Sequence, residues 1–108
     1  MPIPALDELH LLHANICQAV GDPKRIQILY ALYEQPLHVN ALSDVLSIPQ
    51  STISRHLSLL RQRSLVLTDR DGTTVTYRLA DERIIHVLDL MRQLLRDIIE
   101  RQSDKLET

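Results

Sequence analysis

The sequence contains few of the residues that give small proteins large aromatic cores or unusual backbone shapes. Among its 108 residues there is no Trp, no Phe, one Cys, two Gly and three Tyr. The core of such a chain must be aliphatic, and a chain of this length forms one domain rather than several. An aliphatic core of this size gives a monomer modest stability, which favours additional burial in an oligomer.

Further absences exclude whole classes of protein. Cys17 is the only cysteine, and the N-terminus lacks the pattern of a secretion signal, so we expect a reducing, cytoplasmic setting. No apolar run reaches the ~18 residues of a membrane span, so we expect no membrane partner. Paired acids in a cleft motif, a nucleophile elbow and a glycine-rich phosphate loop are all missing, so we predict that the protein is not an enzyme.

The charge is unevenly distributed along the chain. Residues 1–49 sum to −3, residues 50–79 to +3 and residues 80–108 to −2, so the net charge is −2. Binding to nucleic acid depends on the local field rather than on the total charge. The basic middle third is therefore a candidate contact surface for phosphates, although an ordinary solvated helix face has a similar composition.

Hydrophobic periodicity predicts two helices in the first third of the chain. The first covers residues 6–20 and stops at Gly21. The second begins at Asp22 and Pro23, which are typical of an N-cap followed by proline at the first helical position. Pro36 ends this second helix because proline cannot continue the hydrogen-bond ladder.

The next segment has the spacing of a helix-turn-helix. We expect Asn40 to cap a short third helix, and a break at residues 47–49 to lead into a fourth helix over residues 50–63. The positions expected to face inward on this fourth helix are Ile53, Leu57 and Leu60.

After residue 65 the pattern changes from helical to alternating. Residues 66–70 and 73–79 are rich in β-branched side chains, and Asp71 and Gly72 between them are a strong hairpin-turn signal. A fifth helix, which is amphipathic, follows over residues 81–102, and we expect a frayed tail from Ser103. The sequence thus predicts a mainly α fold with one small β-hairpin, in the order α-α-α-α-β-β-α.

This order defines a winged helix-turn-helix, which we expect to occupy residues 1–108 as a single domain. Residues 40–63 would form the helix-turn-helix and residues 66–79 the wing. The apolar face of the last helix is wider than one small domain can cover, so residues 1–20 and 81–102 are predicted to form a two-fold homodimer. The predicted interface residues are Leu9, Leu12, Ile16, Val87, Met91, Leu94, Leu95 and Ile98. The alternative is a monomer whose last helix folds back on its own core.

The second helix of a helix-turn-helix lies in the major groove of DNA. The outward face of residues 50–63 carries short polar and bidentate side chains near its N-terminal turn, and such groups bind base edges or phosphates. A wing can add contacts to the backbone or the minor groove. The predicted DNA-contacting residues are Gln50, Ser51, Thr52, Ser54, Arg55, His56, Arg70, Thr73 and Thr74. The alternatives are that Ser51 and Thr52 only cap the helix and that His56 is partly buried.

Three segments together resemble the ArsR/SmtB family of bacterial winged-helix repressors. They read AVGDPKRIQIL at residues 19–29, IPQSTISRHL at residues 48–57, and a DG hairpin leading to VTYRL at residues 71–79. The resemblance covers about residues 15–100. It implies a dimeric repressor that binds double-stranded DNA at an imperfect inverted repeat and is released by an inducer.

The family's sensor positions depart from pattern here, so the inducer stays open. Residues 37–40 read LHVN, where arsenic- and cadmium-type members share a Cys-x-Cys pair. The dithiol typical of redox-type members cannot form, because Tyr30 stands at the first position and the C-terminal part has no Cys. The positions that match the zinc-type site are Ile84, His86, Asp97 and Glu100.

A second candidate metal site lies in the first predicted helix. His10, His13 and Cys17 share one face of a regular helix, and imidazole with thiolate suits zinc or copper. Two solvated histidines and a small buried cysteine are the alternative, so we expect no cofactor unless such a metal ion binds. The alternative functions are a metal- or redox-responsive repressor using His10/His13/Cys17 or His86/Asp97/Glu100, and a winged-helix protein-interaction module without DNA binding.

Overall fold

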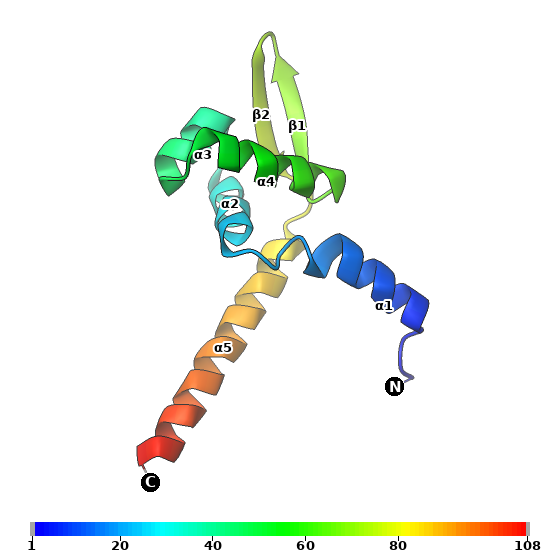
Figure 1. The fold of residues 1–108 in the computed structure, drawn as a ribbon, viewed down its shortest axis with the longest axis vertical. Helices are drawn as coiled ribbons and strands as arrows, with labels where there is room; N and C mark the ends of the chain where they lie inside the picture. Colours follow the sequence, from blue (N-terminus) through cyan, green and yellow to red (C-terminus); the bar gives the residue numbers. More distant parts are fainter. Residues whose placement is uncertain (1, 108) are drawn as a thin grey trace.

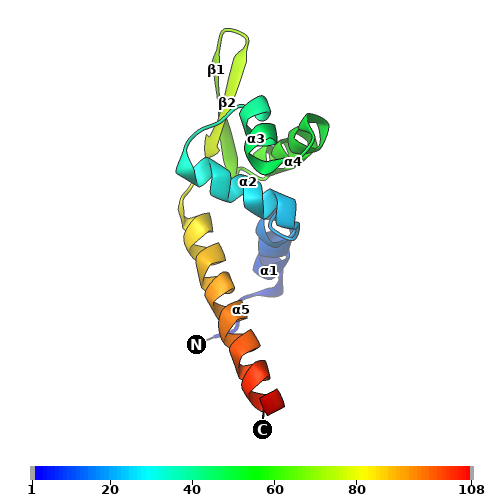
Figure 2. The same cartoon turned by 90° about the vertical axis from the view of Figure 1, so that its left-hand side faces the viewer.

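The computed structural model describes residues 2–107 and has the predicted element order (Figures 1 and 2). The elements are α1 (Leu6–Leu12), the π-helical turn η1 (His13–Cys17), α2 (Pro23–Glu34), α3 (Val39–Leu46), α4 (Gln50–Gln62), β1 (Val66–Asp71), β2 (Thr74–Leu79) and α5 (Arg83–Glu107). The β1–β2 hairpin projects from one end, α2 to α4 lie in the middle, and α5 runs to the opposite end (Figure 1). Within residues 2–107, no helix combines the length and apolar character needed to cross a bilayer.

The core is aliphatic, as the composition predicts, and α2, α3, α4, β1 and the start of α5 all contribute to it. The largest fully buried side chains are Ile28, Leu29, Leu42, Ile53, Leu57, Leu60, Ile85 and Val66. The inward positions predicted for α4 are confirmed, because Ile53, Leu57 and Leu60 are each 0% exposed. Since these three side chains lie on one face, the opposite edge of α4 must point away from the protein.

The predicted start of α2 is confirmed. Asp22 is the N-cap, and its Oδ1 accepts hydrogen bonds from the backbone N–H groups of Lys24 at 2.8 Å and Arg25 at 3.3 Å. Pro23 occupies the first helical position, where a missing N–H costs nothing. These interactions fix the point at which the chain turns from η1 into α2.

The cap predicted for α3 is wrong by two residues. His38, not Asn40, is the N-cap, and its Nδ1 accepts a hydrogen bond from the backbone N–H of Ala41 at 3.1 Å. Asn40 therefore lies inside the first turn, and the helix-turn-helix begins slightly earlier than residue 40. At the other end Ser47 adopts a left-handed conformation with φ of 55°, which closes α3 and turns the chain toward α4.

The hairpin forms as predicted, but its turn lies one residue later. Asp71 pairs with Thr74, so the two-residue loop is Gly72 and Thr73 rather than Asp71 and Gly72. Gly72 has φ of +63°, a value that glycine adopts without strain. Tyr77 of β2 also pairs with Leu37 through backbone hydrogen bonds of 2.8 and 3.0 Å, so the α2–α3 connection is tied to the base of the wing.

The first helical segment is less regular than the prediction of one helix over residues 6–20. The α-helix ends at Leu12, a π-helical turn follows, and the last π-type bond runs from the N–H of Gln18 to the carbonyl of His13 at 2.9 Å. The Asn15 side chain donates to the Leu11 carbonyl at 2.8 Å, which is the kind of local bond that perturbs a helical ladder. The wider turn changes which side chains share a face.

The last helix is longer than predicted. It spans 25 residues to Glu107, or about 37 Å at 1.5 Å per residue, so the frayed tail expected from Ser103 is wrong. Among its described side chains, only Ile84, Ile85 and Leu88 are buried. The rest of α5 projects away from the core (Figure 2), which contradicts the alternative of a last helix folded back on its own protomer.

A core truncation in α4 tests the packing that orients this helix. Leu57→Ala should lower the free energy of unfolding by about 2–5 kcal/mol, because a fully buried leucine leaves a cavity behind. Urea unfolding at a fixed protein concentration measures the loss. The control is Val45→Ala at a position that is 64% exposed, and equal midpoints for the two variants would contradict the assignment of Leu57 to the core.

Candidate nucleic-acid interface

The outer edge of α4 carries the polar side chains that the sequence singles out. Gln50, Ser51, Ser54 and Arg55 are exposed, whereas Thr52 and His56 are partly buried. Pro49 is the N-cap of α4, so Ser51 and Thr52 lie inside its first turn and the alternative in which they cap the helix is wrong. Three free hydroxyl or amide groups and a guanidinium are therefore presented along the first two turns of one helix.

The wing places the other predicted contact residues near its tip. Arg70, Thr73 and Thr74 are all exposed, on either side of or within the Gly72–Thr73 loop. Farther from the tip, Arg78 donates to Asp69 across the strands at 2.9 Å, and the two opposite charges offset one another there. The positive charge nearest the tip comes from Arg70.

Arg25 of α2 contacts α4 through His56, a contact that the sequence-based prediction missed. The guanidinium of Arg25 donates from Nε to the Ala19 carbonyl at 2.6 Å and from Nη2 to the Gln18 carbonyl at 3.0 Å. Its Nη1 lies 3.3 Å from Nδ1 of His56. One signal for this role is visible in the sequence, because a cation in the first turn of a helix opposes the helix dipole and needs another reason to be there.

The contact with Arg25 defines the state of His56. Because a guanidinium can only donate, a hydrogen bond at this contact requires Nδ1 of His56 to accept and the ring proton to reside on Nε2. Partial burial is the main cause that lowers the pKa of the His56 imidazole below its ordinary value, and the nearby positive charges act in the same direction. His56 is partly buried, which is the alternative stated for it, and the ring presents only Nε2 for a further partner.

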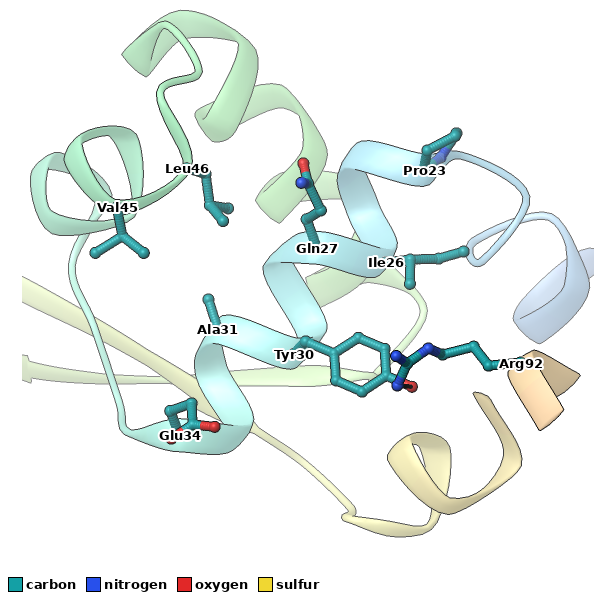
Figure 3. A pocket seen from close by; sticks show the side chains of 9 residues that line it. All are labelled: Pro23, Ile26, Gln27, Tyr30, Ala31, Glu34, Val45, Leu46 and Arg92. Atoms are coloured by element: carbon teal, nitrogen blue, oxygen red, sulfur yellow. Dashed lines mark hydrogen bonds between the residues drawn. The ribbon is translucent and has the colours of Figure 1, made fainter. Parts of the chain in front are cut away.

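A polar cluster connects α2 to α5 beside an open groove of about 600 Å³ (Figure 3). The Tyr30 hydroxyl donates to Asp89 at 2.6 Å, and this bond is the main cause that holds the pKa of the Asp89 carboxyl below its ordinary value. The guanidinium of Arg92 lies 5.2 Å from the centre of the Tyr30 ring, in cation–π geometry. These contacts join α2 to α5 directly after the buried start of α5.

The residues predicted for a dimer interface are exposed in the protomer. Their exposed fractions are Leu9 37%, Leu12 45%, Ile16 37%, Val87 49%, Met91 51%, Leu94 54%, Leu95 55% and Ile98 37%. Figure 1 shows α1 and α5 diverging from the core, so neither helix covers the apolar face of the other within one chain. Contiguous apolar surface on two projecting helices is typical of an interface between chains.

Neither candidate metal constellation is brought together within one chain. Among the described residues, no three His, Cys, Asp or Glu side chains converge in a group that could hold a metal ion. Cys17 is exposed, and the π-helical turn between His13 and Cys17 breaks the regular α-helical spacing assumed for the first constellation. In α5, His86 and Asp97 are separated by three turns, or about 16 Å along the axis.

The sequence matches a known family of bacterial regulatory proteins. Residues 22–67, from the cap of α2 into β1, match the model of bacterial regulatory proteins of the arsR family. The HTH-type transcriptional regulator KmtR of Mycobacterium tuberculosis is 35% identical over 98 residues, which span 91% of this chain and 70% of KmtR.

Solved structures share the fold as well. NolR from Sinorhizobium fredii has a TM-score of 0.74 at 30% identity, over 87% of this chain and 96% of NolR. The homodimeric winged helix-turn-helix DNA-binding domain of Mb0332 from Mycobacterium bovis has a TM-score of 0.74 at 26% identity, over 94% of this chain and 95% of that domain.

The fold and the exposed edge of α4 define a winged helix-turn-helix protein. The chain belongs to the ArsR family of bacterial regulatory proteins, which confirms the resemblance seen in the sequence.

The wing turn can be tested by two substitutions at one position. A Cβ at Gly72 would meet nothing within 4 Å, so the cost of replacement comes from its φ of +63° alone. Gly72→Val should destabilise the hairpin by about 1–2 kcal/mol, whereas Gly72→Asn should cost less because asparagine tolerates left-handed backbone. Amide hydrogen exchange across β1 and β2 measures both effects. Equal protection in the two variants would argue against this turn geometry.

Proposed function

We propose that this protein is a homodimeric transcriptional repressor that binds an inverted repeat in double-stranded DNA through α4 and the wing. The observation that carries the proposal is the polar outer edge of α4, held outward by the burial of Ile53, Leu57 and Leu60 on the opposite face. Exposed amide, hydroxyl and guanidinium groups are the chemistry that reads base edges and phosphates. The basic balance of residues 50–79 supports the same assignment.

The proposed dimer accounts for the exposed apolar faces of α1 and α5. Two-fold pairing through these helices would bury side chains that one chain leaves in water and would duplicate α4. A duplicated recognition helix reads two half-sites about one or more helical turns apart, which is why an inverted repeat is expected. The homodimeric state of the Mb0332 domain, a structure of the same fold, supports this arrangement.

Repression with release by an inducer is the mode of regulation that we propose. A dimer seated on a promoter excludes other proteins from the same DNA, and this needs no chemistry beyond binding. In this proposal the protein is not an enzyme, and it acts in the cytoplasm because its DNA partner lies there. A protein-interaction module of the same fold would give no salt-dependent binding to a selected duplex, so the experiment below separates the two.

The test is selection of bound sequences from random duplex DNA, followed by titration of the selected operator at several salt concentrations. We expect an inverted repeat, and a logarithmic salt slope of about −0.9 for each phosphate neutralised. Arg55→Ala should weaken operator binding by about 1–3 kcal/mol and relax the preference at one base pair. Fluorescence anisotropy with a labelled duplex measures both.

The matched control for Arg55→Ala is Arg96→Ala, which removes the same charge from an exposed position on α5. If the two variants bind the operator equally well, Arg55 is not part of the recognition surface. If wild-type protein selects no sequence and its binding does not depend on salt, the proposed function itself is wrong.

The dimer interface is tested by introducing a charge. Leu94→Glu should weaken dimerisation more than about tenfold, because pairing would bury an uncompensated carboxylate on each chain, and operator affinity should fall with it. Sedimentation velocity at several concentrations measures the dimer population. Val45→Glu, on the exposed surface of α3, is the control for dimerisation, and an unchanged dimer in Leu94→Glu would exclude this face of α5.

A further inference from the structure

Arg25 joins three elements that are separate in the sequence. It lies in the first turn of α2, and its guanidinium donates to the carbonyls of Gln18 and Ala19, where the chain leaves η1. The third contact reaches His56 in the middle of α4, 31 residues away. One side chain therefore links the residues that follow η1, the start of α2 and His56 on the partly buried side of α4.

The position of Arg25 is unfavourable for a helix considered alone. The N-terminal turn of α2 is the positive end of the helix dipole, where acidic side chains are preferred, yet its first turn holds Lys24 and Arg25. The guanidinium compensates by reaching back to the two carbonyls and forward to the imidazole. Its planar fork can serve all three acceptors at fixed angles, which a lysine ammonium on a flexible stem cannot do.

The contact with His56 acts on the side chains that would meet DNA. His56 follows Arg55 directly in α4 and precedes the fully buried Leu57, so it lies at the boundary between the exposed and the buried faces. Apolar packing decides which face of α4 points outward, but it is not directional, so small rotations and shifts of the helix about that position are less restricted. A hydrogen bond at this boundary restricts that motion.

We propose that Arg25 is a positioning residue for DNA recognition, which refines the orientation of α4 by donating to neutral His56 while it holds the Gln18 and Ala19 carbonyls. The inference rests on the proposed function and adds to it a residue outside the predicted contact surface. Arg25 acts through His56 rather than on the duplex. It therefore affects the discrimination between operator and random DNA more than the attraction to phosphates.

The charge around His56 sets the sign of a pH effect. The groups that face the imidazole are Asp22 and Arg25 of the α2 N-terminus, Lys24 beside them, and Arg55 on α4 itself. Burial and the three cations favour the neutral ring and Asp22 opposes them, with the net result that the pKa of His56 is lowered. Near pH 8 the ring is neutral and the contact with Arg25 is intact, so operator affinity should not change with pH through the protonation of His56 there. It should fall once the pH drops below the ordinary histidine value of ~6.5 and through the lowered pKa, because protonated Nδ1 would face a donor.

The first experiment compares Arg25→Lys and Arg25→Gln on the selected operator and on random duplex. Both variants should weaken operator binding by about tenfold, the scale of a charge-assisted hydrogen bond, and should lower the ratio of operator to random affinity. The salt slope should stay unchanged in Arg25→Lys. Rescue of operator affinity by lysine, or a slope reduced by about 0.9 in Arg25→Gln with an unchanged ratio, would identify a phosphate contact and overturn the proposal.

The matched control is Lys24→Gln, which removes one positive charge from the same helical turn and should leave the ratio of affinities unchanged. Circular dichroism and sedimentation establish that each variant is folded and dimeric before its affinity is interpreted. If wild-type protein discriminates the operator but Arg25→Lys discriminates it equally well, the proposed function stands and the role of Arg25 falls.

The second experiment measures the coupling and its pH dependence. The loss caused by Arg25→Lys should be smaller in a His56→Ala background than in wild type, because the two side chains act together. His56→Asn keeps an acceptor near the Nδ1 position but cannot titrate, so it should flatten the fall in operator affinity between pH 7.5 and 5.5 relative to wild type. The proposal would be overturned if the losses of Arg25→Lys and His56→Ala were additive in the double variant. It would also be overturned if the operator affinity of wild type rose as the pH falls and that of His56→Asn did not.

Discussion

The packing of one face of α4 against an aliphatic core is the constraint on which the candidate interface depends. Ile53, Leu57 and Leu60 are fully buried, and their burial determines the rotation of the helix about its axis. The outward direction of the polar edge is therefore a consequence of apolar packing. Polar contacts such as that between Arg25 and His56 then act as fine adjustments on a helix whose exposed face is already decided.

The same small core leaves much of the chain without cover. Among the described side chains, the buried residues of α5 are Ile84, Ile85 and Leu88 at its start, beside the polar cluster around Tyr30, and the helix then projects away from the core. α1 diverges in another direction with its own apolar face exposed. In such a chain the candidate contact surface on α4 and the wing lies away from the projecting part of α5, so under the proposed function DNA recognition and pairing would use separate surfaces.

Comparison of prediction and structure shows which signals were sufficient. The Asp22–Pro23 start of α2 follows from local chemistry alone, and so does the inward face of α4. The predicted cap of α3 is wrong because the imidazole of His38 accepts the capping hydrogen bond, which usually goes to a short polar side chain such as that of Asn40. The hairpin turn was shifted by one residue because both Asp71–Gly72 and Gly72–Thr73 satisfy the same need for glycine, and only the strand register chooses between them.

Local periodicity and turn chemistry determined the element order, the buried face of α4 and the exposed apolar stripes, because these depend on residues within a few turns of one another. The tertiary structure decided what depends on distant residues. It joined Arg25 to His56 and Tyr30 to Asp89, which lie 31 and 59 positions apart, and it directed α5 away from the core. No periodic pattern records such pairs, because they arise only when separate helices pack at particular angles.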